Sequence, residues 1–246
     1  MIPDPILTLA NVCRSFGETS VLSDVSFEVQ DGECVAIVGP SGCGKSTLLR
    51  LIAGLDTPTA GCISRRTPDV QIVFQEAALL PWRTLRENVE LPGELSGSHI
   101  SQHDRAAILA SVNLSDHEDK YPHELSGGMK MRASLARAFV TNSDLYLFDE
   151  PFSAVDEITR DSLQDLFLSL RDQRRFSSVF VTHNIAEAVY LADKVLVMSE
   201  PSRSKTTRIS VIEVPLGTDR HSALKFTSDF TDLCLRVHEE LRVNTP

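Results

Sequence analysis

The sequence predicts an α/β protein whose core is a largely parallel sheet, and two observations carry that prediction. Short apolar, β-rich segments recur along the 246 residues, with helical patterns between many of them. One of these strand segments leads into GPSGCGKST at 39–47, a glycine-rich loop that opens a helix. A strand, a loop of this kind and a helix in that order are typical of a P-loop nucleotide-binding core.

The elements of the core follow from apolar periodicity. Strands are expected, in chain order, at ILTLANV, VSFEV, ECVAIVG, VQIVF, LYLFD, SVFVTH and KVLVMS. Helices are expected at KSTLLRLIAGL, which ends at Gly54, at ITRDSLQDLFLSLRDQ and at NIAEAVYLA, because each carries apolar residues at helical spacing.

Two regions depart from this alternation. Between 81 and 141 the segments TLRENVEL, HDRAAILASVNL and GMKMRASLARAFV are helical, and no strand pattern appears, which indicates a helical insertion. After Ser199 a polar stretch, EPSRSKTTR, precedes a short strand, ISVIEV, and a final amphipathic helix from about Ser222 to Leu241. We therefore predict one domain over 1–246, in which 1–80 and 142–200 form the catalytic core, 81–141 a helical subdomain and 201–246 a C-terminal extension.

The composition limits what the chain can bind. Its formal net charge is −10 and it has no run of basic residues, so no nucleic-acid partner is expected, because affinity for a phosphate backbone comes mainly from clustered Lys and Arg. Five cysteines without CxxC spacing indicate reduced cytosolic thiols. No stretch approaches the roughly 18 apolar residues of a membrane span, so we expect a soluble chain whose role at a membrane would depend on partners.

The loop at 39–47 has the residue types that phosphate binding requires. Its glycines let backbone N–H groups approach phosphate oxygens, and the helix N-terminus adds a partial positive charge. Lys45 is expected to reach the β- and γ-phosphates of ATP, and the Ser46 hydroxyl to ligate Mg²⁺. Cys43 fills a free position of the motif and is not expected to be catalytic. The predicted nucleotide-binding residues of the loop are Gly39, Ser41, Gly42, Cys43, Gly44, Lys45, Ser46 and Thr47.

A pair of carboxylates follows a second buried strand. LYLFDEP brings Asp149 and Glu150 to the C-terminal end of that strand, where ligands bind in open α/β sheets. The pair is expected to divide the work, with Asp149 binding Mg²⁺ and Glu150 polarising the attacking water.

Six motifs in order resemble those of the ATPase subunits of ABC transporters. They are the P-loop, VFQ with Gln75, LSGGM at 125–129, LYLFDEP, SAVD at 153–156 and VTH ending in His183. The resemblance covers nearly the whole chain. It implies the ABC ATPase fold, in which a P-loop NTPase core carries an antiparallel N-terminal β region and an inserted helical subdomain. Its mild departures are Lys130 and Met131 after LSGGM, where the family often has Gln or Arg, and Glu124 before it.

The LSGGM stretch resembles the ABC signature. The resemblance implies that Ser126, Gly127 and Gly128 contact the γ-phosphate of an ATP molecule held on the P-loop of an opposite subunit. A bare helix N-terminus attracts anions, and glycines permit close approach of the backbone, which agrees with that role. The alternative is that Ser126 is a plain helix N-cap. Two head-to-tail ATP sites related by a two-fold axis would result.

Four more positions take expected roles from the resemblance. Phe16 stands where the family usually stacks an aromatic on adenine, although an aromatic near a strand end is more often part of a core. Gln75 would bridge Mg²⁺ and the attacking water. His183 would hydrogen-bond the γ-phosphate, the alternative being that it caps the helix after it. Asp156 would communicate across the dimer.

The sequence around the motifs is most similar to that of importer subunits of the nitrate, sulfonate and taurine family, and thiamine-precursor importers share much of it. The implied partners are a second ATPase subunit, expected to be identical, membrane permease subunits and, indirectly, an extracytoplasmic solute-binding protein. The implied place is peripheral, on the cytoplasmic face of the cell membrane. The segment LLPW at 79–82 is expected to line the groove that receives a permease helix, the alternative being packing within the subdomain.

Two other classes share some of these features. A non-transport ABC ATPase of DNA repair or of ribosomes would keep the catalytic motifs, but such proteins usually carry coiled-coil insertions, paired cassettes or basic surfaces, and this chain has one cassette and a negative charge. A protein that binds ATP without turnover is disfavoured by Glu150, since the expected base is intact.

Overall fold

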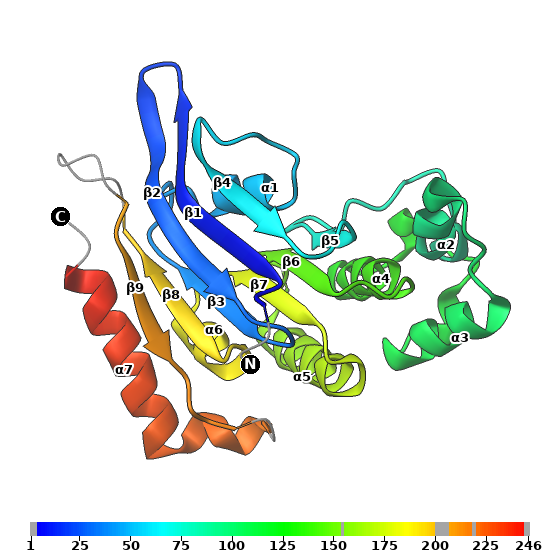
Figure 1. The fold of residues 1–246 in the computed structure, drawn as a ribbon. Helices are drawn as coiled ribbons and strands as arrows, with labels where there is room; N and C mark the ends of the chain where they lie inside the picture. The colour runs from blue at the N-terminus through cyan, green and yellow to red at the C-terminus, as the bar shows by residue number, and fades with distance from the viewer. Residues whose placement is uncertain (1–3, 154, 200–206, 218–219, 244–246) are drawn as a thin grey trace.

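The computed structural model describes residues 4–153, 155–199, 207–217 and 220–243. It confirms the predicted fold class, because a small antiparallel sheet and a larger, mostly parallel sheet lie together with helices around them (Figure 1). Within the described ranges, no helix has both the length and the apolar character that crossing a bilayer would require.

The larger sheet has the strand order β5-β6-β7-β3-β8-β9. All neighbouring strands are parallel except the last pair, in which β9 runs antiparallel to β8. The central strands are short buried runs of the kind that a sheet covered on both faces requires, whereas the edge strand β9 is partly exposed. Their bounds are β3 Cys34–Val38, β5 Val70–Val73, β6 Leu145–Asp149, β7 Ser177–Val181, β8 Lys194–Met198 and β9 Ile209–Glu213.

The smaller sheet has the order β2-β1-β4 and is antiparallel, as the resemblance implied. It consists of β1 Leu7–Phe16, β2 Thr19–Val29 and β4 Ala60–Arg65. The sequence prediction missed β4. Most of its residues are exposed and its segment, AGCISR, shows little apolar alternation, so only pairing with β1 defines it as a strand.

The large sheet separates two apolar cores. Val35 and Ile37 of β3 face the small sheet and α1 (Lys45–Ile52). Ala36 and Val38, which alternate with them, face the opposite core. That opposite core contains packed aromatic rings and the apolar faces of α4, α5, α6 and α7. The bounds of these helices are α4 Gly127–Phe139, α5 Glu157–Arg174, α6 Ile185–Leu191 and α7 Ser228–Val243.

Helices and turns alone occupy the chain between β5 and β6 among the described residues. They are α2 Leu85–Ser96, α3 Gln102–Ser111, two short 3₁₀ turns at Ser115–His117 and Pro122–Glu124, and α4. Thr84 begins α2 with a capping box, in which its hydroxyl accepts from the Glu87 N–H and the Glu87 carboxylate accepts from the Thr84 N–H. These elements agree with a helical insertion, and the division of the chain at 81 and 141 stays a prediction.

The C-terminal extension begins differently from the prediction. Ser222–Phe226 forms a 3₁₀ turn (η3), and the helix α7 starts only at Ser228. Thr227 between them has an extended backbone, and its hydroxyl accepts from the Phe230 N–H at 3.4 Å. Figure 1 shows α7 at the end of the large sheet opposite to α2 and α3, beside β8 and β9. Phe230 and Val237 bury its inner face.

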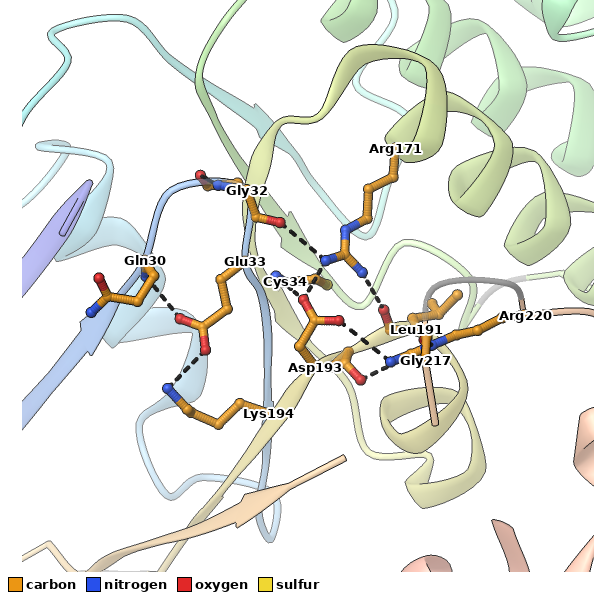
Figure 2. A network of polar contacts seen from close by, with 12 residues as sticks. Gln30, Gly32, Glu33, Cys34, Arg171, Leu191, Asp193, Lys194, Gly217 and Arg220 are labelled. Carbon is orange, nitrogen blue, oxygen red and sulfur yellow. Dashed lines mark hydrogen bonds and ion pairs between the residues drawn. The ribbon is translucent and has the colours of Figure 1, made fainter. Parts of the chain in front are cut away.

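A polar network fastens this extension to the core (Figure 2). Asp193 lies at its centre, where its carboxylate accepts from the Cys34 N–H at 2.9 Å and from the guanidinium of Arg171. Arg171 also donates to the Gly32 carbonyl at 3.0 Å. Arg220, which precedes α7, reaches the other oxygen of Asp193 at 3.4 Å. The start of β3, the last turn of α5 and the C-terminal extension are therefore joined through the carboxylate of Asp193.

Removing Arg220 should destabilise the whole fold. Its side chain is 1% exposed and donates to the carbonyls of Tyr190 and Ala192 at 2.9 and 2.8 Å, besides facing Asp193. Arg220→Ala leaves these acceptors without their donor, so we expect unfolding free energy to fall by about 3 kcal/mol. Arg66→Ala, which removes a half-exposed ion pair, should change it by less than about 1 kcal/mol. Urea titration measures both, and equal effects would contradict the role assigned to the network.

Candidate functional site

The P-loop connects β3 to α1 and curls around the side chain of Lys45. The Lys45 ammonium donates to the carbonyls of Gly39 and Pro40, at 2.8 and 2.9 Å. Gly44 has φ of 100° and its Cα lies against Leu22, so a side chain at this position would be strained and would clash. The loop therefore has the backbone shape that brings consecutive N–H groups toward a bound anion at the start of a helix.

Ser46 and Asp149 come together across this loop. The Ser46 hydroxyl donates to the Asp149 carboxylate at 3.0 Å, although 103 residues separate them in the chain. Burial raises the pKa of Asp149, the Ser46 hydrogen bond lowers it, and the charge of Glu150 raises it again. A carboxylate in such surroundings would gain from a nearby divalent cation.

The donor set fits Mg²⁺. Hydroxyl and carboxylate oxygens are the ligands that this ion prefers, and it usually takes one or two of them from a protein while keeping waters and phosphate oxygens. In the described part of the chain, no three His, Cys, Asp or Glu side chains gather into a cluster that could hold a metal by itself. Ser46 and Asp149 thus suit an ion that arrives with a nucleotide.

Glu150 and His183 form the second half of the site. His183 Nδ1 lies 3.0 Å from Glu150 Oε2, and the Glu150 N–H donates to the Val181 carbonyl at 2.9 Å. The backbone of Glu150 has φ of 48°, a left-handed conformation that is rare outside glycine and often marks functional positions. The sequence prediction missed this conformation, because Pro151 after Glu150 favours an extended backbone and gives no signal for a left-handed one.

The alternative role for His183, as the cap of the helix after it, is wrong. Asn184 is the N-cap of α6, and its side chain accepts from the Glu187 N–H at 3.1 Å. The ring of His183 is 61% exposed and faces Glu150 instead. Its position near the γ-phosphate of a nucleotide stays a prediction.

Gln75 lies at the same edge of the sheet as the acidic pair. It follows β5, in which Val73 is paired with Phe148 of β6, directly before Asp149. The loop after Gln75 is tied to the helical segment, because Arg137 of α4 donates to the Ala78 carbonyl at 2.8 Å. The role of Gln75 at Mg²⁺ and the attacking water stays a prediction.

The LLPW segment divides between packing and exposure. Leu79 packs against the apolar core, as the packing alternative supposed, but Trp82 is 71% exposed and packing does not explain it. Buried Asn88 of α2 fixes the loop, since its side chain accepts from the Leu80 N–H at 2.7 Å and donates to the Leu80 carbonyl at 3.1 Å. A large indole on a braced loop is typical of a docking surface.

The LSGGM stretch begins α4. Ser126 is the N-cap, with its hydroxyl accepting from the Met129 N–H at 3.3 Å, so the capping alternative describes a real contact. The hydroxyl keeps its own proton, which leaves it a donor for a phosphate oxygen. Gly128 lies so close to Thr159 that an added Cβ would stand 2.7 Å from its methyl group. Ser126, Gly128 and Thr159 line a hollow of about 280 Å³ whose lining contains no P-loop residue.

Phe16 and Asp156 occupy surface positions. Phe16, at the end of β1, is 50% exposed, so the core alternative is wrong for it, and the guanidinium of Arg14 lies 4.4 Å from its ring centroid. Asp156 is the N-cap of α5 and accepts from both the N–H and the hydroxyl of Thr159. Ala154 of the SAVD motif lies outside the described residues.

The sequence prediction did not place the C-terminal helix near the nucleotide site. His238, Leu241 and Arg242 of α7 line a hollow of about 580 Å³ together with the start of the P-loop, at 39–41, and His183. No spacing or composition signal links residues two hundred positions apart, so only the packing of α7 along α6 reveals this neighbour.

Comparison with known proteins decides the family. The family model described as ABC transporter matches residues 22–153, which run from within β2 through the P-loop and the LSGGM stretch to just beyond the acidic pair. The chain belongs to the ABC transporter family. With membership comes the activity of the family's ATP-binding cassettes, ATP binding and hydrolysis, and the fold and motif order described above agree with it.

Several curated relatives of this ABC protein are similar over most of their length. It is 45% identical over 222 residues to the aliphatic sulfonates import ATP-binding protein SsuB of Rhodopseudomonas palustris, covering 88% of this chain and 78% of that protein. It is 46% identical over 206 residues to SsuB 1 of Shouchella clausii, covering 83% and 82%. A solved ATP-binding cassette, dimeric and bound to ADP and phosphate, matches with TM-score 0.72 and 29% identity, over 85% of this chain and 98% of that one.

Replacing Lys45 should abolish turnover. Lys45 is the one Lys or Arg in the loop at 39–47, and its predicted role is to bind the β- and γ-phosphates, where water replaces such a charge poorly. We expect Lys45→Ala to lower kcat roughly 10²- to 10³-fold and to weaken nucleotide binding. A phosphate-release assay with parallel binding of a fluorescent ATP analogue measures both. Lys120→Ala in the helical segment is the control, and wild-type turnover by Lys45→Ala would refute the site.

Proposed function

We propose that this chain is the ATP-hydrolysing subunit of an importer for aliphatic sulfonates or chemically similar small solutes such as taurine or nitrate. The observation that carries the ATPase part is the convergence of Lys45, the Ser46–Asp149 pair and the Glu150–His183 pair at one edge of the parallel sheet. The solute class is supported by the names of relatives that are 45% and 46% identical.

The chemistry assigns one role to each side chain. Lys45 binds the β- and γ-phosphates, while the backbone N–H groups at the start of α1 hydrogen-bond their negatively charged oxygens. Glu150 holds the attacking water and orients it toward the γ-phosphorus, and His183 hydrogen-bonds the γ-phosphate beside it. Gln75 contacts the same water from the neighbouring strand. Mg²⁺ bound by Ser46, Gln75 and Asp149 would neutralise charge that develops on the phosphate oxygens.

A second copy completes each site. The Ser126–Gly128 end of α4 is directed at a hollow apart from the P-loop of its own copy, which fits a role toward the nucleotide of another. Phe16 is exposed and suits stacking on the adenine ring. Two ATP molecules then lie between two head-to-tail copies, and their γ-phosphates hold the closed state until hydrolysis removes them.

The membrane partners bind elsewhere. Trp82 and its braced loop suit a helix of a permease subunit, and the loop leads directly from Gln75. Closure of the dimer then moves the helical segments, and through Trp82 the permease. The chain would thus work as a peripheral subunit on the cytoplasmic face of the membrane, and an extracytoplasmic solute-binding protein would deliver the solute on the other side.

The dimer can be trapped by removing the base. Glu150→Gln keeps the shape of the site but cannot accept a proton, so ATP should bind and persist. We expect this variant to accumulate as a dimer with Mg²⁺ and ATP and to return to monomer with ADP, by light scattering with bound nucleotide measured in parallel. Adding Ser126→Arg should restore the monomer without preventing ATP binding, because the large side chain blocks the second contact with the γ-phosphate.

Each outcome of that experiment is decisive. A Glu150→Gln protein that stays monomeric while saturated with ATP at high protein concentration contradicts the completion of the site by a second copy. A dimer that survives Ser126→Arg shows that the copies meet through another surface, and Ser126 is then a helix cap only.

Co-purification tests the transporter assignment. A tagged wild-type chain should bring an integral membrane permease with it, and the reconstituted complex should take up alkanesulfonates. We expect Trp82→Glu to bind ATP normally but to lose the permease, because it puts a charge into an apolar docking surface, whereas Trp82→Phe should keep most of it. A chromosomal or ribosomal complex in the pull-down would contradict the transporter assignment. Normal transport by Trp82→Glu would contradict only the docking role of Trp82.

A further inference from the structure

A groove runs between α7 and the segment that carries His183 and the start of α6, beside the candidate nucleotide site. It consists of two adjoining hollows of about 580 and 660 Å³ that share His183 and His238. The first hollow extends to the start of the P-loop at 39–41, and the second is mainly apolar, with Ile185 and Leu235 in its lining. Leu235 is 53% exposed. We call the two hollows together the α7 groove.

The helix α7, which forms one side of this groove, is packed against the core and hydrogen-bonded to β9. Leu233 and Val237 on its inner face are buried against the core, and Glu240 near its end accepts from the hydroxyl of Ser210 on β9. Arg220, before its start, is anchored to the Asp193 network shown in Figure 2. The groove is thus a feature of the fold that can receive a partner without first being formed by one.

A protruding segment of matching character lies at the start of α5. Ile158 is 84% exposed, and the acidic residues Asp156 and Glu157 precede it directly. Hydrogen bonds from Thr159 lower the pKa of Asp156, so its carboxylate is charged at neutral pH. The segment thus presents an exposed apolar side chain directly after two carboxylates. The packing of a single copy does not cover this isoleucine.

Both features belong to the face that the head-to-tail dimer would use. The α7 groove begins at the P-loop and His183, while Ile158 stands next to Thr159, which contacts Gly128 of the signature stretch. When the signature of one copy lies over the P-loop of the other, the neighbours of the signature approach the neighbours of the P-loop, twice, because of the two-fold axis.

We propose that the α7 groove of each copy receives Ile158 of a second copy, so that the C-terminal helix is part of the ATP-dependent dimer interface. This inference rests on the proposed head-to-tail dimer and names a contact within it. The apolar half of the groove, with Ile185 and Leu235, covers the isoleucine. The end near the P-loop contributes His238 and Arg242, and no carboxylate is among the described lining residues, so it complements Asp156 and Glu157.

The contact would make α7 a reporter of the nucleotide state. Its residues reach the P-loop and His183 on one side and the partner on the other, so separation of the copies after hydrolysis empties the groove. The groove also gives a molecular role to the C-terminal extension, for which the nucleotide chemistry itself has no need.

Cross-linking between two differently tagged copies tests the contact. Both copies carry Glu150→Gln, to hold the closed state, and Cys62→Ser and Cys234→Ala, to remove the exposed thiol and the groove thiol. One copy adds Ile158→Cys and the other Leu235→Cys. A short bismaleimide should give the mixed dimer on a denaturing gel with Mg²⁺ and ATP, and at least about tenfold less of it with ADP.

The outcomes separate this inference from the proposed function. If light scattering shows the ATP-dependent dimer but the mixed band is absent, the inference is wrong while the dimer stands. A band that joins two Ile158→Cys copies, in place of the mixed band, shows that the isoleucines meet at the two-fold axis and also overturns it. If no ATP-dependent dimer forms at all, the proposed function and this inference fall together. Leu95→Cys, at an 80% exposed leucine of α2, should give no ATP-dependent band.

The strength of the contact can be measured in the same background. On Glu150→Gln we expect Ile158→Asp to weaken the dimer at least tenfold with ATP, since two apolar contacts are lost for each dimer. Leu95→Asp, a leucine of similar exposure on α2, should leave the dimer constant within about twofold. If Glu150→Gln alone and Glu150→Gln with Ile158→Asp have equal dimer dissociation constants, the inference is overturned. Circular dichroism checks that both variants are folded.

Discussion

The parallel register of β3, β7 and β6 is the constraint on which the rest of the site depends. Ile37 is opposite Val181, and Val181 is opposite Asp149, so the three strands end at one edge. The chain leaves that edge three times, as the P-loop, as the acidic pair and as the segment that carries His183. Side chains alternate between faces with a period of two, so a one-residue slip of β6 would turn Asp149 away from Ser46 and exchange the residues of the two cores.

The sequence could predict those parts of the structure in which the local pattern and the chemistry agree. The buried strands and the P-loop have strong local signals, and the pairing of Ser46 with Asp149 follows because parallel strands end together. The signals fail where tertiary contacts decide. The strand β4, Ala60–Arg65, exists because β1 offers it a partner, and Thr227 interrupts an apparently continuous helical pattern with an extended backbone. The left-handed backbone of Glu150 accompanies the hydrogen bond from its N–H to the Val181 carbonyl, a tertiary contact that apolar periodicity does not report.

The two ends of the nucleotide site differ in how complete they are. Within a single copy, Lys45 donates into the P-loop, Ser46 donates to Asp149 and Glu150 faces His183, so these side chains are arranged before any partner arrives. The Ser126 end of α4, in contrast, lines a separate hollow whose lining contains no P-loop residue. In the proposed dimer, a site divided in this way would make hydrolysis conditional, because the charge stabilisation from the second helix end would exist only in the closed state. Futile turnover by separate copies would thereby be limited.

In the proposed function, coupling and catalysis use different parts of the molecule, and this separation explains the two helical additions to the core. The insertion between β5 and β6 carries Trp82 and is tied through Arg137 to the loop after Gln75. The extension with α7 lies at the opposite end, anchored through Arg220, and touches the P-loop edge and His183. Each addition contacts the candidate nucleotide site through a segment of its own. On the proposed function, a change in nucleotide state would therefore reach the membrane side and the C-terminal helix by separate physical routes, and a substitution in one route need not disturb the other.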